Sequence, residues 1–221
     1  MRMAAREAVA RFGRRLRSEG LVQWTAGNVS CRVRGEPSLL AMTPTDVPYD
    51  ELDASDVCLV RTDGTLVEGP PPTTELPLHT LVYARRPEVG AIVHTHSAVA
   101  MTMAALGWTL PPILTGLVDA TGGDVATAPY ARPGTPAMAD AVAAVLADRG
   151  ACFLRHHGLL AIGSDLHRAF KAAAVTEASA DVYLRARAFG AVPELPAAEV
   201  DWIAGAWRSQ WSPDRVATTR G

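Results

Sequence analysis

The segment AIVHTHSAV, residues 91–99, places two histidines one residue apart at the end of an apolar run. In a β-strand, residues i and i+2 point to the same face, so His94 and His96 would lie side by side with Thr95 opposite them. Two adjacent imidazoles can bind one metal ion, although a histidine in such a run is more often an ordinary polar group. The segment therefore predicts a buried strand, and a metal site if a third ligand lies nearby.

The sequence on either side of this strand indicates a mixed α/β fold. Val29, Cys31 and Val33 alternate with polar residues as in a half-buried strand, and Asp63-Gly64 predicts a hairpin. Hairpins followed by strands that alternate with helices are typical of a central, mostly antiparallel sheet flanked by helices. We expect one domain over residues 1–221. Helices are expected before Gly20, before Pro87 and over residues 97–106, 135–150, 164–190 and 197–211, with Trp202 and Trp207 as packing residues of the last one.

Composition and charge exclude several classes of protein. Apolar residues make up 48% of the chain and the formal net charge is −2, so a large core can form and nothing indicates binding to nucleic acid or to an anionic membrane. Cys31, Cys58 and Cys152 lie in strand-like runs without CxxC spacing, so we expect free, buried thiols and a reducing compartment. The N-terminal residues lack the apolar segment of a signal peptide, and no apolar run reaches the ~18 residues that span a bilayer. We expect a cytoplasmic protein.

A third metal ligand is available in the segment RHHGLL, residues 155–160. A catalytic zinc or similar ion typically takes three protein ligands and leaves one position open for substrate. His94, His96 and either His156 or His157 would meet that requirement. Taken alone, the histidine pair would be read as a turn with surface side chains, so the metal site depends on the two segments together.

The segment TTEL, residues 73–76, places Glu75 in the first turn of an expected helix. Thr73 or Thr74 can cap the free N–H groups there, and a carboxylate suits the positive end of the helix. The same geometry forms an anion site, and a carboxylate close to a metal can act as a general base. The two interpretations are compatible.

Two further polar loops have the composition of an anion-binding site. In WTAGNVS, residues 24–30, Gly27 and Asn28 favour a tight turn that presents backbone N–H groups and small polar side chains. In MTPTDVPYD, residues 42–50, Thr43 and Thr45 follow an expected strand. Each loop by itself is a weak indication of phosphate binding.

These motifs, together with APYARPGT at residues 128–135, resemble those of the class II aldolase/adducin family in order and spacing. The resemblance covers roughly residues 5–190 and is strongest to the L-fuculose-1-phosphate aldolases and their relatives. It implies an α/β domain with a central antiparallel sheet. It also implies a homotetramer with C4 symmetry and active sites between subunits, with the segment from about residue 192 at an interface.

The resemblance assigns roles to particular residues and implies a reaction. The implied metal ligands are His94, His96 and His157, with Zn²⁺ the usual ion and Mn²⁺, Co²⁺ or Fe²⁺ as alternatives, and Glu75 is the implied base. The implied substrate is a ketose 1-phosphate, cleaved to dihydroxyacetone phosphate and an aldehyde through a metal-stabilised enediolate. The implied phosphate site contains Gly27, Asn28, Thr45, Thr73 and Thr74, with Thr25 and Asp46 beside them.

Two departures from the family pattern leave other functions open. Asp46 stands where the aldolases usually have glycine, and Gly116 stands where fuculose-phosphate aldolases carry a proton-donating tyrosine. An epimerase or decarboxylase for sugar phosphates on the same scaffold is the first alternative, with Asp119 or Asp124 as its acid or base. The second is an inactive, adducin-like interaction module, against which the retained ligands and carboxylate argue.

Overall fold

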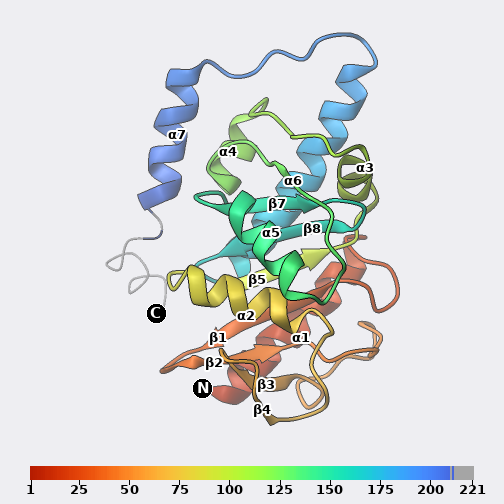
Figure 1. Ribbon diagram of the computed structural model, residues 1–221, viewed down its shortest axis with the longest axis vertical. Helices are drawn as coiled ribbons and strands as arrows, with labels where there is room; N and C mark the ends of the chain where they lie inside the picture. The colour runs from red at the N-terminus through yellow and green to blue at the C-terminus, as the bar shows by residue number, and fades with distance from the viewer. Residues whose placement is uncertain (210, 212–221) are drawn as a thin grey trace.

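An eight-stranded sheet crosses the centre of the computed structural model, with the strand order β4-β3-β2-β1-β5-β8-β7-β6 (Figure 1). The structure describes residues 1–209 and 211. Neighbouring strands are antiparallel except for β6 and β7, which are parallel, so the predicted α/β fold with a mostly antiparallel sheet is confirmed. The strands are β1 (Asn28–Val33), β2 (Glu36–Met42), β3 (Cys58–Arg61), β4 (Leu66–Glu68), β5 (Ala91–Thr95), β6 (Thr127–Ala128), β7 (Ala151–Leu154) and β8 (Gly158–Gly163).

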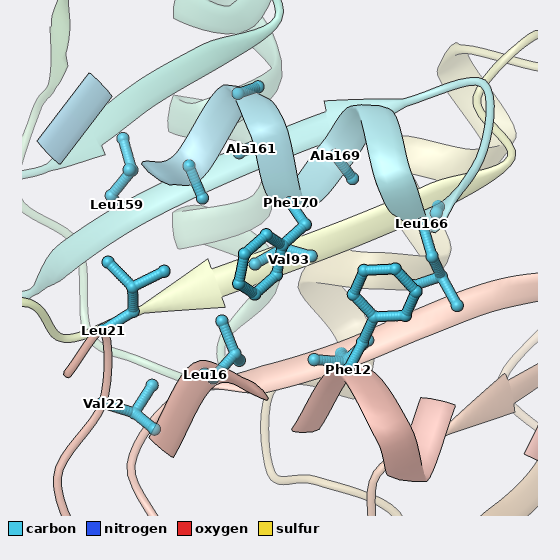
Figure 2. Packing of buried hydrophobic residues seen from close by; sticks show 14 of the residues in the cluster. Phe12, Leu16, Leu21, Val22, Val93, Leu159, Ala161, Leu166, Ala169 and Phe170 are labelled. Atoms are coloured by element: carbon cyan, nitrogen blue, oxygen red, sulfur yellow. The ribbon is translucent and has the colours of Figure 1, made fainter. Parts of the chain in front are cut away.

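Helices cover both faces of this sheet, and strand alternation divides the core between them (Figure 1). On β5, Val93 packs with α1 (Arg2–Ser18), α3 (Ala98–Leu106) and α6 (Leu166–Arg187). Figure 2 shows Phe12 of α1 and Phe170 of α6 in this cluster. The neighbouring Ile92 packs with α2 (Leu76–Arg85) and α5 (Pro136–Leu146) on the other face. His94 has the parity of Ile92, so it points to the α2 side.

Two helices begin at side chains that cap their first turns, close to the predicted starts, whereas other helix boundaries differ from the prediction. Thr135 accepts a hydrogen bond from the backbone N–H of Met138, and Asp165 accepts one from that of Arg168. Helix α5 ends at Leu146, before the predicted stop at Gly150. Helix α4 (Thr115–Thr121) was not predicted, because it is short, contains Gly116 and lacks a clear apolar stripe.

The C-terminal helix α7 (Ala197–Ser209) packs through one of its two predicted tryptophans. Trp207 is buried, and its indole N–H donates to the Ala120 carbonyl at 3.1 Å, which attaches α7 to α4. Trp202 is 73% exposed, so its prediction as a packing residue within this chain is wrong. The sequence predicted that this helix extends to residue 211, but residue 210 lies outside the described residues. Residues 212–221, the end of the expected domain, also lie outside them.

The composition predicted free, buried cysteines and gave no membrane-spanning segment. Cys31, Cys58 and Cys152 are free and buried, as predicted. Within residues 1–209, no helix combines the length and the apolar character needed to cross a bilayer.

Candidate functional site

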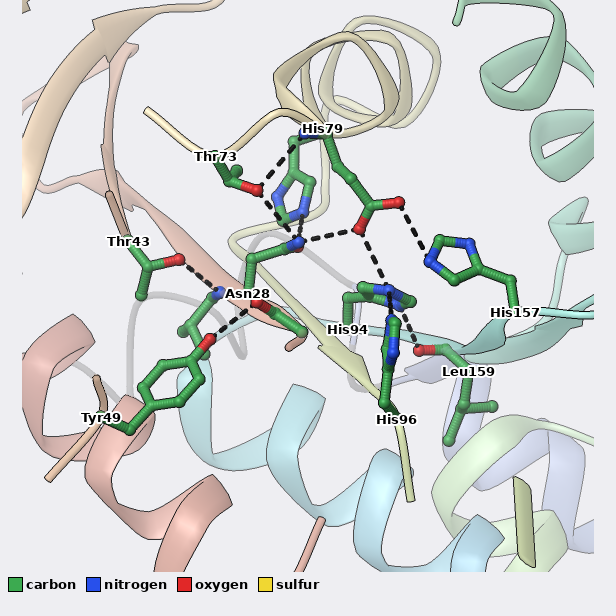
Figure 3. A network of polar contacts seen from close by, with 12 residues as sticks. Asn28, Thr43, Tyr49, Thr73, His79, His94, His96, His157 and Leu159 are labelled. Atoms are coloured by element: carbon green, nitrogen blue, oxygen red, sulfur yellow. Dashed lines mark hydrogen bonds and ion pairs between the residues drawn. The ribbon is translucent and has the colours of Figure 1, made fainter. Parts of the chain in front are cut away.

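Three histidines from two parts of the chain meet at one end of the sheet. His94 lies on β5 opposite Asn28 of β1, and His96 follows two residues later on the same face. His157 belongs to the turn between β7 and β8, where its N–H donates to the Leu154 carbonyl at 2.9 Å. The three ring centroids are 4.7–4.8 Å apart, and one nitrogen from each ring lies within 4.8 Å of the others (Figure 3). The group has the size of a site for one metal ion.

The hydrogen bonding of His94 defines which of its nitrogens is free. Nδ1 lies 2.8 Å from the carbonyl oxygen of Leu159, to which it donates its proton, so Nε2 carries the lone pair (Figure 3). Burial, followed by the nearby His157, lowers the pKa of His94 to about 3, so the ring is neutral. Nε2 nevertheless lies 3.0 Å from Oε2 of Glu75. Two acceptors at that distance repel each other unless a cation lies beside both of them.

The remaining donors also fit a divalent cation. Burial lowers the pKa of His96 to about 3, and its Nε2 lies 2.9 Å from Nε2 of His94. Oε1 of Glu75 is buried, has no hydrogen-bond partner within residues 1–209 and 211, and lies 3.6 Å from Nε2 of His157. Neutral imidazoles are good ligands for zinc, iron and similar metals, and an orphaned carboxylate oxygen adds a negative charge beside them. The donor set therefore suits a three-histidine site with a carboxylate at its edge.

Gly158 allows the histidines to approach each other. A Cβ at this position would lie 2.2 Å from the Thr95 carbonyl oxygen and 3.2 Å from both the Cε1 of His94 and the Cδ2 of His96. Any side chain larger than hydrogen would push β8 away from β5. The glycine after the histidine pair thus has a packing role in the site.

Glu75 is held at the start of α2 by residues from the predicted phosphate site. It occupies the N-cap position, so α2 begins just after it, at Leu76, and Glu75 is not in the first turn as predicted. Asn28 donates from Nδ2 to Oε2 of Glu75 at 2.8 Å and lies 3.2 Å from the Thr73 hydroxyl. That hydroxyl accepts from the backbone N–H of Glu75 at 3.3 Å, as expected for a threonine that satisfies free groups at the helix start. Asn28, Thr73 and Glu75 therefore form one buried cluster.

Other residues of the predicted phosphate site lie at its edge. Thr45 is half-buried, and its backbone N–H donates to the Pro71 carbonyl at 3.1 Å, which leaves its hydroxyl as the group available to an anion. Asp46 has a left-handed backbone with φ of 57° and an exposed side chain. Thr25 and Thr74 are also exposed. Among the described residues, no hydrogen bond or ion pair joins Thr25, Thr45, Asp46 or Thr74 to the three histidines.

Gly27 has a backbone conformation and a contact that exclude other residues. Its φ is +76°, and a Cβ would lie 2.6 Å from the His94 carbonyl oxygen. Tyr49 donates its hydroxyl proton to the Gly27 carbonyl at 2.8 Å, which attaches this loop to the segment between β2 and β3 (Figure 3). The turn predicted from Gly27 and Asn28 is therefore fixed directly beside the histidines.

Gly27→Ala should reduce the free energy of unfolding well beyond the effect of Gly35→Ala. Both glycines have a left-handed backbone, but a Cβ at Gly35 meets nothing within 4 Å. Both variants lose ~1–2 kcal/mol from the left-handed conformation. Only Gly27→Ala adds a steric term of ~1–3 kcal/mol against β5. Urea unfolding of the two variants provides the measurement, and equal losses would show that the loop moves away without strain.

Sequence reasoning missed three buried polar residues behind Asn28. The residues are Ser30, His79 and Tyr83, and the Ser30 hydroxyl hydrogen-bonds to both of the others. Glu75, His79 and Tyr83 follow each other at a spacing of four, which places them on one face of α2. This spacing was the available signal, and it was hidden by the apolar residues between them.

Comparison with protein families matches residues 7–184 to the Class II Aldolase and Adducin N-terminal domain. This range covers most of the chain, so the protein belongs to the class II aldolase/adducin family. The resemblance found in the motifs is confirmed.

Individual relatives agree with this assignment. The 5-deoxy-D-ribulose 1-phosphate aldolase of Bacillus thuringiensis is 36% identical over 200 residues, which are 90% of this chain and 93% of the relative. The 3-oxo-tetronate 4-phosphate decarboxylase of Cupriavidus necator is 34% identical over 215 residues, which are 93% of this chain and 97% of the relative. A solved L-fuculose 1-phosphate aldolase superimposes with a TM-score of 0.88 at 30% identity, covering 93% of this chain and 96% of the other. The relatives are thus aldolases and a decarboxylase of phosphorylated sugar derivatives.

Proposed function

We propose that the protein is a metal-dependent class II aldolase that cleaves a ketose 1-phosphate to dihydroxyacetone phosphate and an aldehyde, and forms it in reverse. The observation that supports this most is the convergence of three imidazoles on the carboxylate of Glu75. The aldolases among the relatives also support this function. The proposed metal ligands are His94, His96 and His157.

The chain's own residues divide the reaction between them. When bound at the three histidines, a divalent cation, most simply Zn²⁺, would act as a Lewis acid for negative charge that develops on the substrate's carbonyl oxygen. Leu159 holds the ring of His94 in the tautomer that presents Nε2 to the site. Glu75 is the proposed base, because its Oε1 is buried, has no hydrogen-bond partner among the described residues and lies 3.6 Å from Nε2 of His157. It moves the proton on the carbon next to the carbonyl.

The phosphate is proposed to lie beside the start of α2. Asn28 and Thr73 contribute side chains, and the helix N-terminus contributes a positive potential. Gly27, Thr45 and Thr74 are the other proposed contacts, with Thr25 and Asp46 at the edge. Because Asp46 is exposed, its carboxylate can turn toward solvent and need not repel the dianion.

A homotetramer with C4 symmetry is the proposed assembly, with the segment from about residue 192 at an interface. Large aromatic side chains support it. Trp202 of α7 is 73% exposed, and Trp24, in the loop before Gly27, is 85% exposed. Tryptophan is enriched in protein–protein interfaces relative to the rest of the protein surface. The molecular mass in solution tests this assembly.

A product screen tests the proposed activity. Dihydroxyacetone phosphate is incubated with a panel of short aldehydes and purified protein, first after chelation and then with Zn²⁺, Mn²⁺, Co²⁺ or Fe²⁺ restored. We expect a ketose 1-phosphate product that requires the metal. Failure with every aldehyde and every metal would reject the aldolase.

A decarboxylase is the second candidate, because the relative from Cupriavidus necator carries that activity at similar identity. Gly116, at an exposed position of α4, offers no proton donor where fuculose-phosphate aldolases have tyrosine. Asp119 and Asp124, the alternative acid or base, are paired with Lys171 and Arg149 respectively, which argues against their use. Release of CO₂ from a 3-oxo acid phosphate, without aldol condensation, would favour this candidate.

Asn28→Ala should raise KM for the phosphorylated substrate by about 10- to 100-fold, which corresponds to the ~1.5–3 kcal/mol of a hydrogen bond to a charged group. In this proposal the phosphate replaces the Thr73 hydroxyl as the acceptor of the second amide N–H, while the first stays on Glu75. An unphosphorylated analogue provides the control, since it lacks the group that Asn28 is proposed to bind. Steady-state kinetics with both substrates provides the measurement. If KM rises equally for both, Asn28 does not bind the phosphate.

A further inference from the structure

A chain of buried hydrogen bonds leads through the domain to the carboxylate of Glu75. Its members, in order, are Tyr83 of α2, Ser30 of β1, His79 of α2 and Asn28 of β1, and Asn28 contacts Glu75. The distances are 2.9 Å from the Tyr83 hydroxyl to Ser30 Oγ, 2.7 Å from there to His79 Nδ1, and 2.5 Å from His79 Nε2 to Asn28 Oδ1. The last step is the 2.8 Å bond from Asn28 Nδ2 to Glu75 Oε2. Figure 3 shows His79 directed at Asn28.

The carboxylate determines the direction of every bond in this chain. An ionised carboxylate only accepts, so Asn28 must direct its NH₂ group to Glu75 and its carbonyl oxygen to His79. His79 must then donate from Nε2, which leaves Nδ1 to accept from the Ser30 hydroxyl. The Ser30 oxygen in turn accepts from Tyr83. Only one tautomer of His79 and one orientation of the Asn28 amide satisfy all four bonds.

The position of His79 makes this arrangement rigid. Its side chain is completely buried, and burial lowers its pKa to about 3, so the ring stays neutral. A flipped Asn28 amide would place its oxygen against the Glu75 oxygen and its NH₂ group against the Nε2 proton. Buried contacts of that kind are strongly unfavourable, because the groups are shielded from bulk solvent and lie in a region of low dielectric constant.

The geometry points to His79 as a positioning residue that acts on Glu75 through the amide of Asn28. This inference rests on the proposed role of Glu75 as the base. Asn28 holds Oε2, which lies 3.0 Å from Nε2 of His94, while Oε1 has no hydrogen-bond partner. By fixing the amide, His79 keeps one carboxylate oxygen occupied and the other free to take the substrate proton.

Two substitutions of His79 separate this role from simple packing. Glutamine can place an N–H near the position of Nε2 and so retain the donor to Asn28. Asparagine reaches only as far as Nδ1, so it retains a partner for Ser30 and loses the donor. Both introduce a neutral amide into the same buried space, and they are therefore matched controls for each other.

We expect His79→Gln to retain kcat within a few-fold and His79→Asn to lose at least 10-fold, with metal content unchanged in both. Urea unfolding of both variants separates a loss of stability from a loss of positioning. If the two variants have equal kcat, or if the loss in His79→Asn follows loss of metal, the inference is overturned. Tyr83→Phe removes only the far donor and should cost less than His79→Asn.

A spectroscopic measurement tests the same chain without turnover. In protein labelled with ¹⁵N-histidine and stripped of metal, His79 should carry its proton on Nε2, and the Nε2 resonance should shift in Asn28→Ala. A proton on Nδ1 would overturn the inference, whatever the catalytic activity of the protein. If instead the wild-type protein shows the Nε2 proton but makes no aldol product, the proposed function fails while the hydrogen-bond chain stands.

Discussion

His96→Ala is expected to lose its divalent metal and its turnover together. The substitution removes one of three imidazoles whose nitrogens lie within 4.8 Å of one another, and two remaining histidines cannot complete the site. Loss of residues that merely support metal ligands typically lowers metal affinity by ~10–100-fold, so removal of a ligand should lower it by more. Metal analysis after dialysis, paired with kcat for the aldol reaction, is the measurement.

His156→Asn is the matched control for this variant. His156 is exposed, and its ring lies 6.1 Å from that of Tyr130 and outside the group of three. Its φ is 57°, a conformation that asparagine tolerates, so the turn should keep its shape. This control should keep its metal. Full metal occupancy and full rate in His96→Ala would remove that residue from the metal site.

The contrast between His156 and His157 shows how far sequence reasoning reaches. Strand alternation predicts that His94 and His96 share a face, and the structure agrees, because that rule depends only on local geometry. Residue types alone leave open which histidine of the pair joins His94 and His96. The choice depends on the left-handed backbone of His156, which turns one ring outward and brings His157 against the strand. A turn of that shape depends on contacts across the domain.

The hydrogen-bond chain behind Glu75 was missed for a related reason. Asn28 and Ser30 alternate on β1, while His79 and Tyr83 are four apart on α2. Each pattern can be recognised alone, but neither indicates that the strand and the helix face each other. Only the packing of α2 on the sheet brings the two patterns into register. The fold class was predictable because it depends on the order of the elements, whereas this contact depends on how they pack.

Trp202 shows the limit of reasoning from burial alone. Its large apolar side chain in a helical pattern favours packing within the chain, and Trp207 in the same helix does pack in that way. Trp202 is exposed in the single chain. An apolar residue can be covered by a second subunit as well as by its own core, and one sequence does not distinguish the two.

Glu75→Gln should lower kcat by ~10²–10⁴-fold, the range of a general acid–base step, and leave metal content unchanged. The three histidines keep their nitrogens. The new amide can accept from Asn28 through its oxygen, in place of the 2.8 Å bond to Oε2. Its NH₂ group then takes the position of Oε1, the oxygen without a partner. The variant therefore keeps the packing and the hydrogen bond of Glu75 and loses only the basic oxygen.

The measurement that isolates this step is exchange of the dihydroxyacetone phosphate C–H proton with solvent, followed by NMR without any aldehyde. The exchange requires proton abstraction but no carbon–carbon bond, so the identity of the aldehyde does not affect it. We expect Glu75→Gln to exchange slowly in proportion to its loss in kcat. His79→Asn should fall between this variant and the wild type, because it retains the carboxylate but loses its alignment. Exchange at the wild-type rate in a metal-loaded Glu75→Gln enzyme would exclude Glu75 as the base and, with it, the positioning role inferred for His79.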